Sequence, residues 1–140
     1  MARNLESDIR LTLPAWPENV AVVRHVVGAL SEALDLPPNV ADDMRLAVTE
    51  ACTNVVRHAY SDDGGTIDVV VRLQRRALDV IVADSGRGIE PSPDTSGPGL
   101  GLPLIAALAE SLEIERSAGA GSRLTMSFPR CGATPAMGFA

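Results

Sequence analysis

Three residues with polar, chemically versatile side chains occur four positions apart near the middle of the chain: Glu50, Asn54 and His58. The surrounding sequence is typical of a helix, and a spacing of four places side chains on one helical face, roughly 6 Å apart along the axis. A carboxylate, an amide and an imidazole arranged in this way can contact one ligand together. A second polar segment, Asp84-Ser85-Gly86-Arg87-Gly88, follows downstream.

These residue types favour a nucleotide and a hard cation as the ligands. The amide oxygen of Asn54 is a suitable ligand for Mg²⁺, which takes its remaining ligands from phosphate and water. Glu50, one turn earlier, could accept a proton from an attacking hydroxyl or water. Asp84 follows an apolar strand and could accept a hydrogen bond from an exocyclic amine such as adenine N6. Gly86 and Gly88 permit a close approach of the ligand to the backbone.

A second glycine-rich segment comes directly before a predicted helix. Gly97, Gly99 and Gly101 alternate with Pro98 and Leu100. The free N–H groups and the positive end of the following helix could meet phosphate groups. This segment is therefore a candidate phosphate-binding element, in addition to Asp84 for the amine and Asn54 for the cation.

Each pattern also has a purely structural interpretation. The helical row could be a solvated edge, although Asn54 is a weak helix former and its position in a helix calls for a reason. His58 is better explained as a residue that caps or packs the helix end. Asp84 could form a turn at the end of its strand. Cys52 is best explained as a small apolar core residue.

Composition excludes several classes of protein. The chain has 140 residues, is 46% hydrophobic and carries a formal net charge of -6, which argues against a nucleic-acid or anionic-membrane partner. All 12 basic residues are arginine. The absence of lysine excludes a P-loop NTPase and a eukaryotic-type protein kinase. No signal peptide or membrane span is expected, so we expect a cytoplasmic protein.

Hydrophobic periodicity predicts an α/β fold. Apolar alternation and Val/Ile-rich runs indicate strands, and apolar residues three and four apart indicate helices. We expect strands at 8–13, 66–73, 78–83, 113–117 and 123–128, and helices at 17–34, 39–59 and 100–112. This order predicts a two-layer α/β sandwich with a mixed, mostly antiparallel sheet and helices on one face. A single domain would span residues 1–128, followed by a flexible tail at 129–140.

These motifs resemble those of a known superfamily, the GHKL (Bergerat-fold) ATPases. Glu50-x-x-x-Asn54-x-x-x-His58-Ala59-Tyr60 is similar to the N box of that superfamily, and Asp84-x-Gly86-x-Gly88 is similar to its first glycine box. The second glycine box and the closing Gly-Thr motif resemble Gly97-x-Gly99-Leu100-Gly101-Leu102 and Gly121-Ser122-x-Leu124. Within the superfamily, the His-Ala-Tyr ending and the small size most resemble the anti-sigma factor serine kinases.

The resemblance implies a role for each motif residue. Asn54 would hold Mg²⁺, Asp84 would recognise adenine, and Glu50 would be the catalytic base. The residues expected to bind the cofactor ATP are Asn54, Asp84, Gly86, Gly88, Gly97, Gly99, Leu100, Gly101, Leu102 and Ser122. Ile89 to Pro98 would form a lid over the nucleotide. Pro98 and Pro103 depart from the usual pattern in and after the second glycine box.

The function implied is transfer of the γ-phosphate of Mg-ATP to a serine of an anti-sigma factor antagonist, together with binding of a sigma factor. Three alternatives remain open at this point: an ATP/ADP-gated protein-binding switch without transfer, a detached histidine-kinase-type ATPase domain, and a hydrolase that uses water. A homodimer is an open alternative to a monomer. The residues do not name the sigma factor, the antagonist or the substrate serine.

Overall fold

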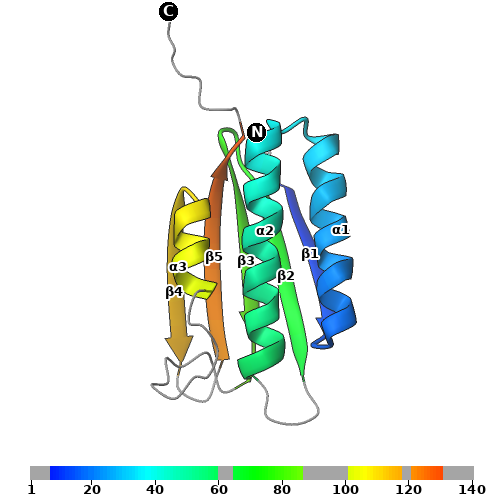
Figure 1. Cartoon of the computed structure of the whole chain (residues 1–140), viewed down its shortest axis with the longest axis vertical. Coiled ribbons are helices and arrows are strands. Elements are labelled where there is room, and N and C mark those ends of the chain that lie inside the picture. Colours follow the sequence, from blue (N-terminus) through cyan, green and yellow to red (C-terminus); the bar gives the residue numbers. More distant parts are fainter. Residues whose placement is uncertain (1–6, 60–64, 87–100, 118–120, 131–140) are drawn as a thin grey trace, which may run out of the picture.

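The computed structural model describes residues 7–59, 65–86, 101–117 and 121–130. Within these ranges the chain forms two layers, a five-stranded sheet and three α-helices that cover one face of it (Figure 1). The strands are β1 (Ser7–Pro14), β2 (Thr66–Leu73), β3 (Ala77–Asp84), β4 (Ser111–Ser117) and β5 (Gly121–Pro129). The helices are α1 (Pro17–Ala33), α2 (Pro38–Asn54) and α3 (Gly101–Leu108), and a π-helical segment, η1 (Val55–Ala59), follows α2.

The sheet has the strand order β1-β2-β3-β5-β4, and all four pairings are antiparallel. The predicted sandwich with helices on one face is therefore confirmed, and the expected mostly antiparallel sheet is antiparallel at every described pairing. Strands β2 and β3 form a hairpin, and its turn is closed by a hydrogen bond from the N–H of Gln74 to the carbonyl of Ala77 (3.0 Å).

Helix α2 lies in the middle of the helical layer, between α1 and α3 (Figure 1). It runs in the same direction as β3, so both elements end at the lower end of the view in Figure 1. The antiparallel register of β3 and β5 brings the start of β5 to that end as well. The ends of α2 and β3 therefore meet the starts of α3 and β5, which places four sequence-distant segments together.

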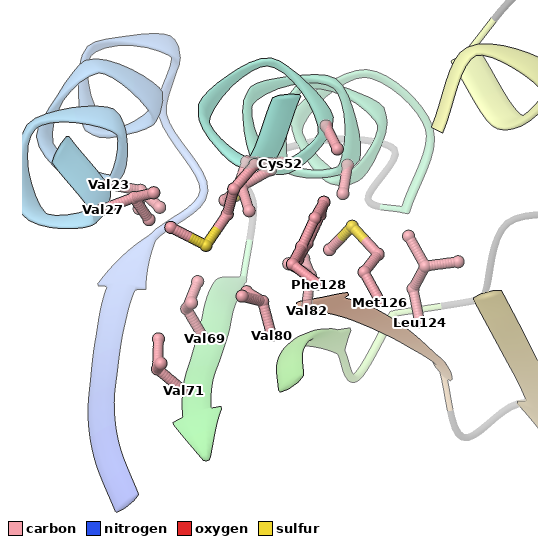
Figure 2. Close-up of a cluster of buried hydrophobic side chains, with 14 of the residues drawn as sticks. Val23, Val27, Cys52, Val69, Val71, Val80, Val82, Leu124, Met126 and Phe128 are labelled. Carbon is pink, nitrogen blue, oxygen red and sulfur yellow. The ribbon is translucent and has the colours of Figure 1, made fainter. Parts of the chain in front are cut away.

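The hydrophobic core lies between the two layers (Figure 2). On the sheet side, alternate residues of the three central strands point toward the helices, as the strand period of two requires. On the helix side, the apolar stripes predicted for α1 and α2 face them, and the α2 stripe is completely buried. The side chains of the central core include Val23, Val27, Cys52, Val69, Val71, Val80, Val82, Leu124, Met126 and Phe128.

Two predicted boundaries were wrong. The helix expected to run to Leu112 ends at Leu108, and β4 begins at Ser111 instead of Glu113. The reason is a hydrogen bond from the N–H of Glu110 to the carbonyl of Ser127 (2.8 Å), which joins this segment to β5. Leu112 then pairs with Met126 in the sheet. The apolar pattern of this segment is compatible with both a helix and a strand, and pairing with β5 decides for the strand.

The predicted tail begins at Pro129, but in the structure this residue ends β5. The guanidinium of Arg130 donates a hydrogen bond to the carbonyl of Gln74 (2.7 Å), and its backbone N–H donates to the carbonyl of Arg76 (2.9 Å). Residues 129 and 130 are therefore attached to the β2–β3 turn. Residues 131–140 lie outside the described part of the chain.

Cys52 provides a test of the core. Its side chain is fully buried in α2, and burial raises the pKa of the thiol from 9.0 to about 12. With Cys131 replaced by serine, we expect the remaining thiol of the folded protein to react with a thiol reagent at pH 8 about a thousandfold more slowly than in urea, because little thiolate is present. Reaction of the native protein at the rate of the unfolded chain would contradict this arrangement.

Candidate functional site

Asp84 is a buried carboxylate at the end of β3, with 5% of its surface exposed. Ser122 of β5 lies opposite it in the sheet register and is also buried. The Ser122 hydroxyl donates a hydrogen bond to Oδ2 of Asp84 (2.6 Å), and the backbone N–H of Gly86 donates to Oδ1 (2.9 Å). Each carboxylate oxygen thus accepts one bond and keeps a lone pair that can accept another. The site is therefore a fixed, buried acceptor.

Gly121 makes the contact between Ser122 and Asp84 possible. Its backbone φ is +93°, a conformation that favours glycine. A Cβ atom at this position would lie within 2.0 Å of the carbonyl oxygen of Asp84, which is a severe overlap. Glycine at the start of β5 therefore lets the two strands approach closely at this end of the sheet. The predicted motif contained Gly121, but sequence reasoning assigned no role to it.

Asn54 is the last residue of α2, and its half-buried side chain lies against the first residue of α3. A Cβ atom built on Gly101 would be 2.8 Å from Nδ2 and 3.1 Å from Oδ1 of Asn54. The fold thereby joins the N box to the second glycine box. No hydrogen bond links the Asn54 amide to another residue in the described ranges, so its oxygen is available to a ligand.

Glu50 is half-buried one turn before Asn54, on the same helix. Its carboxylate forms no hydrogen bond or ion pair with the described part of the chain. The neighbouring Thr49 hydroxyl, in contrast, bonds to the carbonyl of Arg45 on its own helix (2.7 Å). The predicted pair Glu50 and Asn54 is thus present on α2. His58 lies beyond α2 in η1, where the backbone is π-helical. Short π-helical segments are often found at functional sites.

Asn54, Asp84, Gly86, Gly101 and Ser122 all lie at the end of the fold where α2 and β3 end, with Glu50 one helical turn before Asn54. The printed contacts form two groups, Asn54 with Gly101, and Asp84 with Ser122 and Gly86. Helix α2 packs on β3 and β5, and η1 packs on β3. Leu102 packs against the hydrophobic core, so its predicted contact with the nucleotide stays a prediction. Pro103 lies in the first turn of α3, where the absence of its N–H costs little. Gly88, Gly97, Gly99, Leu100 and the predicted lid, Ile89 to Pro98, lie outside the described residues.

A separate groove of about 660 Å³ lies between α1 and α2, near the α1–α2 connection. It is lined by charged side chains of both signs, among them Arg24, Glu32 and Asp42. None of the predicted site residues lines it. The imidazole of His25, which also lines the groove, donates from Nδ1 to the carbonyl of Ala21 (2.9 Å).

The donors available at the site limit how a metal could be held. Across residues 7–59, 65–86, 101–117 and 121–130, no group of three or more His, Cys, Asp or Glu side chains could hold a metal ion. A cation that keeps several waters and takes phosphate oxygens as ligands fits this site, and Mg²⁺ has these properties.

Among the described helices, none has the length and apolar character needed to cross a membrane.

Comparison with known proteins identifies the family of this chain. The family model described as "Histidine kinase-like ATPase domain" matches residues 13–128. The chain belongs to this family of nucleotide-binding domains, which confirms the resemblance to the GHKL ATPases. A relative named "Serine-protein kinase RsbW", from Halalkalibacterium halodurans, is 34% identical over 87% of this chain and 84% of its own length. A protein of the same name from Bacillus thuringiensis is 34% identical over 79% of each chain.

Two solved structures share the fold. The crystal structure of the RsbU and RsbW domains of a Mycobacterium tuberculosis protein matches with a TM-score of 0.71 at 23% identity, over 89% of this chain and 32% of that chain. The histidine kinase domain of a blue-light activated histidine kinase from Erythrobacter litoralis matches with a TM-score of 0.59 at 21% identity, over 84% of this chain and 61% of the other. At these identities the likeness concerns the fold.

The Ser122–Asp84 hydrogen bond should contribute to stability. We expect Ser122→Ala to lower the free energy of unfolding by about 1–3 kcal/mol, because a buried carboxylate oxygen loses its donor. Ser122→Thr keeps the hydroxyl and should retain most of the stability. Ser127→Ala in the same strand is the matched control and should change stability by no more than about 0.5 kcal/mol. Equal urea midpoints for Ser122→Ala and Ser127→Ala would contradict the assigned bond.

Proposed function

We propose that this chain is an ATP-dependent protein serine kinase of the anti-sigma factor type. The single structural observation that carries the proposal is the contact of Asn54 with Gly101 at the end of the fold that also holds the Asp84–Ser122 pair, as expected if the separate sequence motifs contribute to one site. The 34% identity to proteins named serine-protein kinase, over most of both chains, supports a kinase in particular.

The site residues fit Mg-ATP. Asp84 would accept a hydrogen bond from the adenine amine through the lone pairs that Ser122 and Gly86 leave free. The Asn54 oxygen would be the protein ligand of Mg²⁺, which, when bound, neutralises phosphate charge and orients the transferred group. Gly101 begins α3, so the positive end of this helix would face the phosphates.

Glu50 would act on the substrate hydroxyl. The serine oxygen forms a bond to the γ-phosphorus, the bond from that phosphorus to the leaving oxygen of ADP breaks, and the proton of the hydroxyl passes to the Glu50 carboxylate. Its position one helical turn from Asn54 places base and cation ligand on the same side of α2. The half-buried carboxylate has no other partner in the described residues, so it is free for this role.

The partners we propose are an anti-sigma factor antagonist, as the phosphorylated protein, and a sigma factor, as the protein that is bound. The relatives' name and the shared fold support a protein substrate. The net charge of -6 gives no support to a direct nucleic-acid interaction.

The proposal is tested by incubating the protein with radiolabelled Mg-ATP and a candidate antagonist encoded nearby, followed by phosphoamino-acid analysis. We expect phosphoserine on the antagonist. A label that is acid-labile and base-stable would instead favour a histidine kinase. Release of inorganic phosphate without labelling would favour a hydrolase, and nucleotide binding without either would favour a switch.

Glu50→Gln tests the base. The substitution keeps the size of the side chain but removes the carboxylate that accepts the proton, so the transfer rate should fall by about 10²–10⁴-fold while ATP affinity stays near that of the wild type. Single-turnover phosphorylation and fluorescent-nucleotide binding measure the two quantities separately. Wild-type turnover in this variant would remove Glu50 from the catalytic step.

Asp84→Asn tests adenine recognition. The variant presents a neutral amide to the exocyclic amine, so ATP affinity should fall by about 10- to 100-fold, the amount expected for loss of a hydrogen bond to a charged group. The preference for ATP over GTP should shrink with it. Competition of both nucleotides against a fluorescent ATP analogue measures this preference, and equal affinity of the wild type for ATP and GTP would contradict the assignment.

A further inference from the structure

We infer that Gly101 is a positioning residue for Asn54: the missing side chain at the start of α3 leaves the space that the Asn54 amide occupies, and the backbone there sets the direction of the amide. This inference rests on the metal role of Asn54 proposed above. It assigns to Gly101 a steric function separate from any contact of its N–H with phosphate.

The distances carry the first step. A Cβ atom on Gly101 would be 2.8 Å from Nδ2, 3.1 Å from Oδ1 and 3.3 Å from Cγ of Asn54, closer than the 3.4–4 Å of ordinary van der Waals contact. The three atoms nearest to this Cβ position all belong to the Asn54 amide. The amide therefore occupies the space that a side chain at position 101 would need. Any larger residue at position 101 would require the amide to rotate.

The second step is the lack of another constraint on the amide. Asn54 forms no hydrogen bond within the described ranges, and the terminal torsion of asparagine is broad. Packing must therefore select its orientation. Helix α3 itself is held in place, because Ile105, one turn after Gly101, is completely buried and Leu102 packs on the core. The first turn of α3 thus holds the amide against the end of α2.

Alanine at position 101 would affect the Asn54 side chain more than the backbone of α3. The backbone of Gly101 does not have the positive φ found at Gly121. Alanine is also a better helix former than glycine. Gly101→Ala is therefore compatible with the α3 backbone, and the main adjustment falls on the Asn54 side chain. The loss should appear in metal-dependent nucleotide binding more than in folding.

The experiment measures binding of a fluorescent ATP analogue in EDTA and over a range of MgCl₂ concentrations. We expect Gly101→Ala to raise the half-maximal Mg²⁺ concentration about tenfold, the scale of displacing a group that orients a metal ligand, with little change in EDTA. Gly28→Ala is the matched control, because a Cβ there meets only Arg45 Nε at 3.9 Å. It should leave Mg²⁺ dependence unchanged.

A double-mutant cycle with Asn54→Ala separates this inference from the proposed function. Once the amide is removed, Gly101→Ala should cause no further change in Mg²⁺ dependence. The change in melting temperature caused by Gly101→Ala should also be more favourable in the Asn54→Ala background than in the wild-type background. A Gly101→Ala protein that fails to fold but is restored by Asn54→Ala would equally support the contact.

The outcomes differ in what they overturn. If Asn54→Ala leaves Mg²⁺ dependence unchanged, the metal role fails, whereas the melting-temperature cycle still decides whether Gly101 and Asn54 are coupled. If Gly101→Ala shifts the melting temperature equally in both backgrounds, or binds Mg²⁺ and nucleotide as the wild type does although Asn54→Ala changes the Mg²⁺ dependence, Gly101 does not position Asn54.

Discussion

The hydrogen bond between Ser122 and the buried Asp84 carboxylate is the interaction on which this end of the molecule depends. A carboxylate removed from water is costly unless donors compensate it, and here one donor comes from β5 and one from the backbone beyond β3. The requirement for both donors fixes the register of the central strand pair at its end. The same bonds orient the carboxylate, so stability and the adenine recognition proposed for Asp84 rest on one arrangement.

Helix α2 connects this strand pair to the rest of the site. Its buried face carries small residues, including Ala47, Ala51 and Cys52, each with 1% exposure or less, which allow the helix to lie close to the sheet. Glu50 and Asn54 occupy the edge of that face and stay half-buried. Close packing thus places a carboxylate and an amide at the margin of the core without burying either completely. A helix with bulkier residues on its buried face would lie farther from the sheet.

Two glycines serve the site in different physical ways. Gly121 adopts a positive φ and lets the backbones of β5 and β3 approach, so its effect is on the main chain. Gly101 lies against a side-chain amide in an unremarkable helical conformation, so its effect is on the space beside Asn54. The fully buried, protonated thiol of Cys52 on α2 takes no part in this chemistry and acts as core.

Much of the fold and of the site is determined locally and was predictable. The apolar periods of α1, α2, β2 and β3 match the structure closely, because each depends on residues near one another in sequence. The positions of Asn54 in a helix and of Asp84 at the end of a strand were predictable in the same way. The end of α3 and the start of β4 were not, since one apolar run suits both elements and pairing with β5 decided between them. Tertiary structure alone also placed Gly101 against Asn54 and Ser122 against Asp84, because these contacts join residues 47 and 38 positions apart, and only packing of the two layers sets such distances.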